Sequence, residues 1–325
     1  MKKIALASIG GTISMQVSNN GGITPQIGAK DFISSIPEIK KIAQISTHNL
    51  FNIASGHITF QNLLEAYNWA KNAAKDSQGI IITQGTDTLE ESAFFLSLLW
   101  NEPIPLILTG AMRSSDELGY DGLNNIYNAI TLIVNYPSSL NAGVMVVMNN
   151  TIHHPLWMQK KHSLALETFD SMHQELGIIF ENKVEFFRPL SPLPKFPNLQ
   201  TLHKKVFCYE HSLDDEKEIL EWAGEKYDGI VIAGYGAGHT NLQTRDTIIK
   251  IAKTKPVIMC ARTYAGPSAI STYGYLGSEI DLQKEGVVMS KWLQPKKARI
   301  LLTILLSQNL GIKDFINFRD FITIK

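Results

Sequence analysis

The sequence predicts an α/β protein, with a doubly wound, mostly parallel sheet in a large N-terminal domain and a smaller α/β domain after it. Short apolar segments of strand length alternate with segments of helix length, which is typical of parallel sheets with right-handed crossovers. The alternation stops once, at a proline-rich stretch, and then begins again. A chain of 325 residues is long enough for two domains with cores of their own.

The first predicted strand, residues 4–9, is apolar throughout, as expected of a strand buried on both faces of a sheet. It ends in Gly10 and Gly11, which allow a sharp turn and let another molecule approach their N–H groups. Thr12 is the first reactive side chain after the turn. Because ligands of open α/β sheets bind at the carboxyl ends of strands, Thr12 is a candidate functional residue. The alternative is a tight turn in which Thr12 only caps a helix.

The next segments connect the first strand to a second one. Residues 15–27 are rich in Asn, Gly, Ser and Gln, so they form either a lid over a site at the strand ends or an ordinary hairpin or connector. A short helix is predicted at residues 31–40. A strand at residues 45–53 then ends before Ser55 and Gly56, and a further helix follows. Ser55 therefore belongs to the same predicted edge of the sheet as Thr12.

The strand at residues 79–83 repeats the design of the first strand. It is followed by a glycine and then by Thr86, Asp87 and Thr88 before a helix. Thr88 with Glu91 fits a capping box, which explains this threonine by helix structure alone. Thr86 and Asp87 have no such explanation. Two strand ends with a Gly-Thr pair are more than turn chemistry requires, which favours a shared site.

The remaining elements continue the alternation. We predict strands at residues 104–108, 143–148, 205–209, 229–233 and 256–260, helices at 123–134, 214–223, 241–252 and 296–306, and a hairpin at 176–187 with Glu181, Asn182 and Lys183 as its turn. Residues 188–197 contain four prolines, which no helix or central strand continues through. The predicted organisation is an N-terminal α/β domain over residues 1–190, a proline-rich linker over 191–204 and a smaller α/β domain over 205–325.

Composition excludes several classes of partner. Lysine plus arginine equals aspartate plus glutamate at 30 each, so the basic field needed to bind nucleic acid is missing. No apolar run is long enough for a membrane span, and Lys2-Lys3 leads straight into the first strand. Cys208 and Cys260 lie in apolar, strand-like settings that favour free buried thiols. The glycines of residues 234–238 lack the helix-packing glycine of a nucleotide site. We therefore expect a cytoplasmic, reduced protein without a nucleic-acid or membrane partner.

Gly10-Gly11-Thr12-Ile13 together with Gly85-Thr86-Asp87-Thr88 resembles the two signature motifs of the bacterial-type asparaginases, and most of all the cytoplasmic type I members. These are amidohydrolases with threonine nucleophiles. Further similarity covers nearly the whole chain, in residues 109–113, 121–122, 146–149, 229–231 and 294–299. The resemblance implies hydrolysis of the side-chain amide of L-asparagine to L-aspartate and ammonia. It also implies no cofactor, no metal, and a homotetramer built as a dimer of dimers.

The resemblance assigns catalytic roles to Thr12, Thr86, Asp87 and Lys160. A threonine hydroxyl needs a nearby base, and Lys160 would supply it. Without the resemblance, Lys160 and its neighbour Lys161 would be interpreted as a solvated pair. Asp87 would either orient Lys160 or bind the substrate ammonium group. Thr12 is the usual site of the covalent bond in the family, although the sequence leaves the choice between the two threonines open.

The residues that the resemblance places around the substrate are Gly11, Ser55, Gly56, Ala111 and His239. Ser55 would contact the α-carboxylate, and the carbonyl group of Ala111 would face the scissile amide nitrogen. Asp121 and Arg113 would support that corner of the site.

The chain also departs from the family pattern. Gly56 replaces a glutamine, and His239 lies where an asparagine of the neighbouring subunit often reaches the substrate. The loop after the first strand has no tyrosine, and the tyrosines that could replace it are Tyr120, Tyr235, Tyr264 and Tyr273. Two other functions therefore stay open. One is hydrolysis of glutamine or another amide, and the other is a non-catalytic sensor that binds an amino acid.

Overall fold

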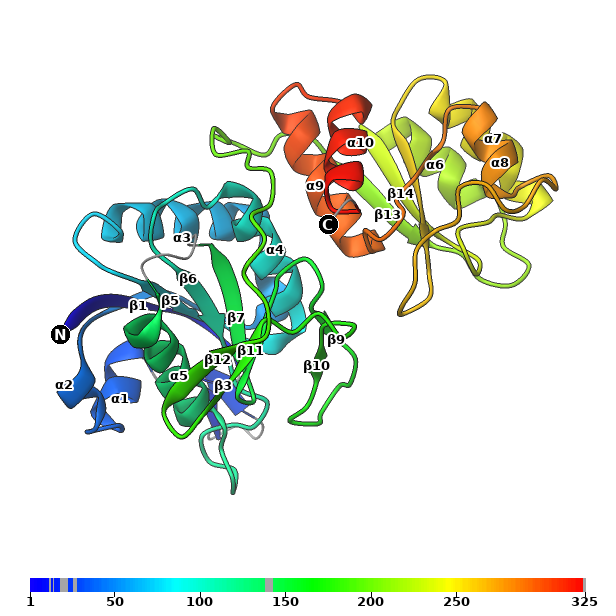
Figure 1. Cartoon of the computed structure of the whole chain (residues 1–325). Helices are drawn as coiled ribbons and strands as arrows, with labels where there is room; N and C mark the ends of the chain where they lie inside the picture. The colour runs from blue at the N-terminus through cyan, green and yellow to red at the C-terminus, as the bar shows by residue number, and fades with distance from the viewer. Residues whose placement is uncertain (12, 14, 18–22, 26–27, 138–142, 324–325) are drawn as a thin grey trace. The chain divides into compact units, whose positions relative to one another are not determined.

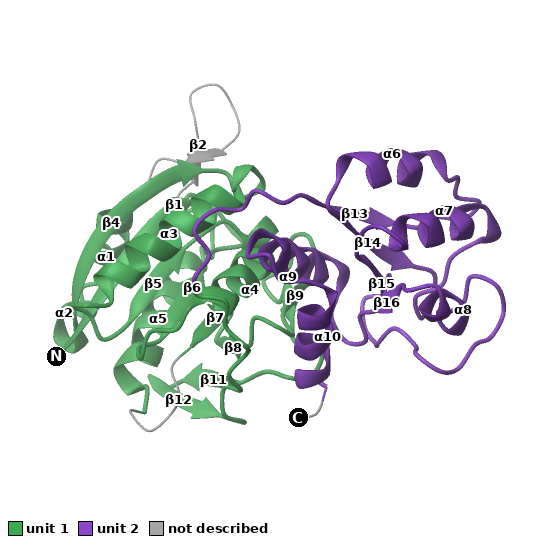
Figure 2. Ribbon diagram, turned by 90° about the horizontal axis from the view of Figure 1, so that it is seen from above, with its two compact units in different colours: residues 1–197 green, residues 198–325 purple. Residues whose placement is uncertain are grey.

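The computed structural model describes residues 1–325 except 12, 14, 18–22, 26–27, 138–142 and 324–325, and it leaves out the side chains of 15–17 and 23–25. The chain divides into two compact units, Met1–Pro197 and Asn198–Lys325 (Figure 2). The first unit combines a mostly parallel sheet with helices and the second a smaller parallel sheet with helices, which confirms the predicted fold class. None of the described helices combines the length and the apolar character needed to cross a bilayer.

Within the described residues, the first unit is built on an eight-stranded sheet with the order β12-β11-β8-β7-β6-β5-β1-β4, whose strands are labelled in Figure 2. Its parallel strands are β1 (Lys2–Gly10), β4 (Ala43–Ile53), β5 (Ile80–Thr83), β6 (Leu106–Thr109) and β7 (Val144–Met148). Its antiparallel strands are β8 (Thr151–His153), β11 (Gly177–Phe180) and β12 (Lys183–Phe186). Every residue of β5, β6 and β7 is buried, as the continuous apolar runs predicted.

Helices cover both faces of this sheet, with α1, α2 and α5 on one face and α3 and α4 on the other (Figure 1). Their bounds are α1 (Ala29–Ser34), α2 (Ile39–Ile42), α3 (Phe60–Ala73), α4 (Leu89–Leu99) and α5 (Gly122–Asn135). The prediction of one helix over residues 31–40 is wrong, because α1 and α2 are separated. Pro37 lies between them, and a proline disfavours the helical conformation of the residue before it.

The order of the strands places the two Gly-Thr motifs at neighbouring positions. Strand β1 pairs with β4 on one side and with β5 on the other, so the direction of winding reverses between β1 and β5. Open α/β sheets bind ligands outside the carboxyl ends of their strands at such a switch point. Strand β1 ends at Gly10 and is followed by Gly11, and Gly85 and Thr86 follow β5.

The first unit contains two hairpins, one in a segment that the sequence left open and one that it predicted. Residues 15–27 contain β2 (Met15–Val17) paired antiparallel with β3 (Ile23–Pro25), so the described parts of this segment form a hairpin. The predicted hairpin at residues 176–187 is confirmed as β11 and β12. Its turn is shorter than predicted, because Lys183 already belongs to β12. Glu181 and Asn182 both have positive φ, which is the two-residue turn that matches strand twist.

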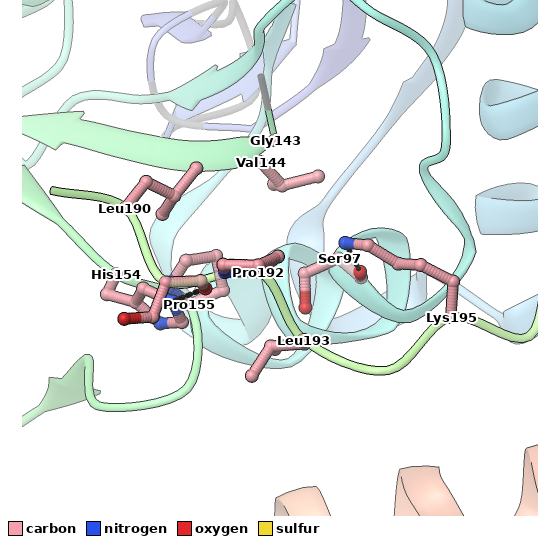
Figure 3. A pocket seen from close by; sticks show the side chains of 10 residues that line it. Ser97, Gly143, Val144, His154, Pro155, Leu190, Pro192, Leu193 and Lys195 are labelled. Atoms are coloured by element: carbon pink, nitrogen blue, oxygen red, sulfur yellow. Dashed lines mark hydrogen bonds between the residues drawn. The ribbon is translucent and has the colours of Figure 1, made fainter. Parts of the chain in front are cut away.

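The proline-rich segment is attached to the carboxyl end of α4 (Figure 3). The Nζ of Lys195 donates to the carbonyl oxygen of Ser97 at 2.7 Å, and the N–H of Phe196 donates to that of Leu98 at 2.7 Å. The last carbonyls of a helix have no partner inside the helix, and its dipole favours a cation there. Burial lowers the pKa of Lys195 to about 8.

The second unit has a four-stranded parallel sheet with the order β13-β14-β15-β16 in its described residues. Its elements are β13 (Val206–Glu210), α6 (Glu218–Lys226), β14 (Gly229–Gly234), α7 (Leu242–Ala252), β15 (Val257–Ala261), α8 (Glu279–Lys284), β16 (Val288–Met289), α9 (Pro295–Ser307) and α10 (Ile312–Phe321). The helix predicted at 214–223 starts later, because Asp214 has a positive φ and the Asp215 side chain pairs with His211. Neither Cys208 nor Cys260 forms a disulfide, as predicted; Cys260 is buried as expected, whereas Cys208 is only half-buried.

The buried His153 of β8 predicts a pH dependence of stability. Its side chain is 3% exposed and its Nδ1 lies 2.8 Å from the Oγ of Ser171. Burial lowers the pKa of His153 from 6.5 to about 4. Between these values the unfolded chain takes up a proton that the folded chain does not. The stability is therefore present above pH 6.5 and is lost as the pH falls to 4, by about 3 kcal/mol for this group.

Replacing His153 by glutamine should remove this part of the pH dependence. We expect the difference in unfolding free energy between wild type and variant to change by about 3 kcal/mol between pH 7 and pH 4, measured by urea titration at several pH values. The control is His57→Gln, because His57 is an exposed histidine of the same unit. Parallel pH profiles for the wild type and His153→Gln would contradict the interpretation.

Candidate active site

The two glycine turns lie backbone against backbone. Gly10 and Gly11 have φ of 99° and 91°, which side chains rarely adopt. A Cβ atom added to Gly11 would overlap the backbone of Gly85, and one added to Gly85 would lie 2.8 Å from the Cα of Gly11. The strand ends that the sequence predicted to share a site are therefore in direct contact. Thr12, the side chain after this turn, lies outside the described residues.

Lys160 reaches the second of these turns. It lies on β9 (Gln159–Lys160), which pairs with β10 (Phe169–Asp170). Its Nζ donates to the Oγ1 of Thr86 at 2.9 Å and to the Oδ1 of Asp87 at 2.9 Å. The side chain of Lys160 is 15% exposed, whereas Lys161 is 43% exposed and pairs with Asp170 instead. Lys160 is therefore mostly buried, whereas Lys161 is exposed to solvent.

Asp87 is held as a carboxylate at neutral pH. The hydrogen bond from Lys160 lowers the pKa of Asp87, and the charge of Lys160 and a hydrogen bond from Ser55 act in the same direction, although burial opposes them. The Asp87 side chain is 71% exposed, so one part of it orients Lys160 while the rest remains accessible. This geometry is compatible with both roles that the sequence left open for Asp87.

Ser55 joins the same network from the end of β4. Its Oγ donates to the Oδ2 of Asp87 at 3.0 Å and accepts from the Asp87 N–H at 3.3 Å. Thr88 donates to the carbonyl oxygen of Ser55 at 2.9 Å and accepts from the Nε2 of Gln84 at 3.1 Å. The predicted capping role of Thr88 is therefore wrong, because its side chain makes no capping bond to α4. Next to Ser55, Gly56 is exposed and has open space where a Cβ would be.

The turn after β6 borders the site next to Thr86. Ala111 is fully buried, and the carboxylate of Asp121 accepts from the N–H groups of Met112 at 3.1 Å and Arg113 at 3.0 Å. The predicted supporting role of Asp121 is confirmed by these bonds. A Cβ added to Gly110 would lie 3.4 Å from the Cγ2 of Thr86, so this corner adjoins the Lys160 cluster.

Tyr120 lies in the first unit and is a candidate to replace the tyrosine that the loop lacks. Its hydroxyl donates to the carbonyl oxygen of Ile13 at 2.9 Å, beside the turn that follows β1. Burial, with a contribution from Asp121, raises the pKa of Tyr120 far above its usual value, so the phenol keeps its proton. The other three tyrosines belong to the second unit.

His239 lies in the second unit, in the turn after β14. Its Nε2 is 3.0 Å from the Oε2 of Glu279, and its Nδ1 is 2.7 Å from the hydroxyl of Tyr275. Burial opposes the ionisation of Glu279, but the N–H groups of Tyr273 and Thr272 outweigh it and lower the pKa of this carboxyl. Glu279 therefore remains a carboxylate that orients the His239 ring. Sequence reasoning missed Glu279, because a lone glutamate in a polar segment carries no signal.

The cluster in the first unit joins a hydroxyl, an amine and a carboxylate in one hydrogen-bonded chain. Such a chain can move a proton between a nucleophilic hydroxyl and a base. Sequence reasoning also missed Glu90, whose carboxylate accepts from the backbone N–H of Lys160 at 2.6 Å. The only sequence feature that could have identified Glu90 is its position as an acidic residue in the first turn of a very apolar helix. In the described part of the chain, no group of three His, Cys, Asp or Glu side chains could hold a metal ion.

Known proteins and family models match nearly the whole chain. Residues 3–192 match the family described as "Asparaginase, N-terminal", and residues 205–317 match the "Glutaminase/Asparaginase C-terminal domain". A probable L-asparaginase of Deinococcus radiodurans is 33% identical over 96% of this chain and 94% of its own length. L-asparaginase 2 of Escherichia coli is 30% identical over 95% of this chain and 90% of its own length. A crystal structure of a probable cytoplasmic L-asparaginase from Campylobacter jejuni has a TM-score of 0.87 and 31% identity, covering 98% of this chain and 99% of that one.

Proposed function

The chain belongs to the asparaginase family, and on this premise we propose that it hydrolyses the side-chain amide of L-asparagine to L-aspartate and ammonia. The observation that carries the proposal is the position of Lys160, whose Nζ lies 2.9 Å from both the Thr86 hydroxyl and the Asp87 carboxylate. This is the combination of groups that amide hydrolysis by a threonine hydroxyl needs. The similarity to proteins named L-asparaginase supplies the substrate.

In the proposed reaction, a threonine hydroxyl attacks the amide carbon and loses its proton. The carbon–nitrogen bond then breaks, and the nitrogen takes up a proton and leaves as ammonia. A water molecule attacks the resulting ester, which releases aspartate and returns a proton to the threonine oxygen. We assign the ester to Thr12, on the family resemblance, and the proton transfers to Thr86 and Lys160. The short contact between Thr86 and Lys160 supports the second assignment.

The substrate would lie against the two glycine turns. The exposed carboxylate of Asp87 suits an α-ammonium group, and the Ser55 hydroxyl suits the α-carboxylate. We propose that Gly11, Gly56 and the carbonyl of Ala111 complete the contacts in the first unit. These assignments extend the family's motifs to the matching positions of this chain.

We further propose that His239 reaches the substrate from a neighbouring copy of the chain, within a homotetramer built as a dimer of dimers. The support is the resemblance of the turn that carries His239 to the family's subunit-bridging turn. We also propose a cytoplasmic location, as stated for the similar Campylobacter jejuni protein.

Glutamine is the second candidate substrate. The family that residues 205–317 match is described as glutaminase as well as asparaginase. A glutaminase-asparaginase of Pseudomonas aeruginosa is 28% identical over 97% of this chain and 89% of its own length.

Ammonia release by the purified protein tests the proposal directly. We expect turnover of L-asparagine and slower turnover of L-glutamine. Lys160→Met should lower kcat for asparagine by about 10³-fold, because it removes the proton-transfer group and keeps the side-chain length. The control is Lys161→Met, which removes the neighbouring solvated lysine and should retain the wild-type rate. Binding of asparagine without ammonia release by the wild type would favour the sensor instead.

A further inference from the structure

Lys160 is attached to the rest of the first unit by few backbone contacts. Its strand β9 pairs with β10 in a two-stranded sheet that is separate from the eight-stranded sheet. The N–H of Lys161 donates to Thr168 beside β10 at 2.8 Å. Because successive N–H groups of a strand point to opposite sides, the N–H of Lys160 points away from β10. It points to α4, where the Oε2 of Glu90 accepts it at 2.6 Å.

Glu90 is an unusual residue for its place. It is the second residue of α4 and only 3% exposed, in a helix whose other buried residues are mainly apolar. Burying a carboxylate costs several kcal/mol unless hydrogen bonds compensate. The hydrogen bond from the Lys160 N–H, at 2.6 Å, satisfies one oxygen of this buried side chain. This hydrogen bond links the backbone of Lys160 to the first turn of α4.

One continuous segment therefore contacts both the side-chain amine and the backbone N–H of Lys160. The Nζ contacts Thr86 and Asp87, and the backbone N–H contacts Glu90, four residues after Thr86. The short 3₁₀ turn Thr86–Thr88 leads directly into α4, so these three partners form one continuous segment. While the Glu90 bond is intact, β9 cannot move relative to α4, so the distance between the Lys160 amine and the Thr86 hydroxyl is kept.

We propose that Glu90 is a positioning residue, which sets the distance from the Lys160 amine to the Thr86 hydroxyl by anchoring the Lys160 backbone. The inference rests on the proposed function, because it assigns Lys160 to the proton transfer. A misplacement of a reacting group by 1 Å can cost about 10²-fold in rate. Loss of the anchor should therefore lower kcat and leave KM nearly unchanged, since the groups proposed to bind the substrate α-groups, Ser55 and Asp87, still bond to each other.

Three variants test the inference by kinetics of ammonia release. We expect Glu90→Ala to lower kcat for asparagine by about 10²-fold with less than about a threefold change in KM. Glu90→Gln keeps an oxygen that accepts the Lys160 N–H, so it should retain at least about a fifth of the wild-type kcat. Glu91→Ala removes the adjacent carboxylate of the same helical turn and should retain the wild-type kcat. Thermal unfolding of each variant reports whether it folds.

Crystal structures of the wild type and the variants provide the readout that does not depend on activity. In Glu90→Ala the Nζ of Lys160 should move out of hydrogen-bonding distance of Thr86, and in Glu90→Gln it should stay. Wild-type kcat and an unmoved Lys160 in Glu90→Ala would overturn the inference. So would a Glu90→Gln protein as slow as Glu90→Ala with Lys160 in place. If Glu90→Ala does not fold, Glu90→Gln alone decides. A wild type without amidase activity would refute the proposed function, and the crystal structures would still test the anchor.

Discussion

Replacing Thr86 by valine is expected to lower kcat for asparagine hydrolysis by about 10³-fold or more. Valine has the shape of threonine, so the methyl group of Thr86 beside the corner at Gly110 is kept. The change removes the hydroxyl that accepts from Lys160 at 2.9 Å and leaves that amine with Asp87. Loss of a group that transfers protons typically costs about 10² to 10⁴ in rate. KM should change far less, because the proposed contacts of the substrate α-groups remain.

The matched control for this variant is Thr83→Val, three residues earlier on β5. Thr83 is fully buried, and among the described residues its hydroxyl has no hydrogen-bond partner. An unpaired buried hydroxyl costs about 1 kcal/mol or more, so valine there should leave the stability unchanged or increase it and should keep the wild-type kcat. The two variants are compared by their rates of ammonia release and by urea unfolding. A fully active Thr86→Val would remove Thr86 from the proposed mechanism.

The parts of the site on strand ends could be predicted from the sequence. Apolar runs identify β1 and β5 as buried strands, and the glycines after them identify sharp turns. The order of the strands then places Gly11 and Gly85 together, because both follow neighbouring parallel strands at the same edge. The pairing of β1 with β5 and the contact of the two backbones required the structure. A sequence shows that glycine permits a close approach but does not name the segment that approaches.

Lys160 could not be placed in this way. Strands β9 and β10 have two residues each, which is too short for any periodicity, so the sequence placed Lys160 only through the family resemblance. What distinguishes Lys160 from Lys161 is burial and a set of partners far away in the sequence. The capping interpretation of Thr88 failed partly for the same reason. Its hydroxyl donates to Ser55, which is far away in the sequence, and accepts from Gln84, which is four residues earlier.

Gly11→Ala is expected to damage both stability and catalysis. The φ of Gly11 is 91°, where a residue with a Cβ is strained by about 1–2 kcal/mol. The new Cβ would also overlap the backbone of Gly85, and such overpacking typically costs about 1–3 kcal/mol. Backbone atoms cannot rotate away as a flexible side chain can. The strain can be relieved only by separating the turn after β1 from the turn that leads to Thr86.

We therefore expect Gly11→Ala to lower the unfolding free energy by about 3 kcal/mol, which corresponds to roughly 6–12 °C in the thermal midpoint for a unit of this size. The kcat should fall by at least about 10²-fold in the fraction that folds, because Thr86 moves with Gly85 relative to the first turn. Gly56→Ala is the control for stability, since nothing lies within 4 Å of its added Cβ and it should leave the midpoint unchanged. A Gly11→Ala protein with the midpoint and kcat of the wild type would show that the two turns need not touch for the site to work.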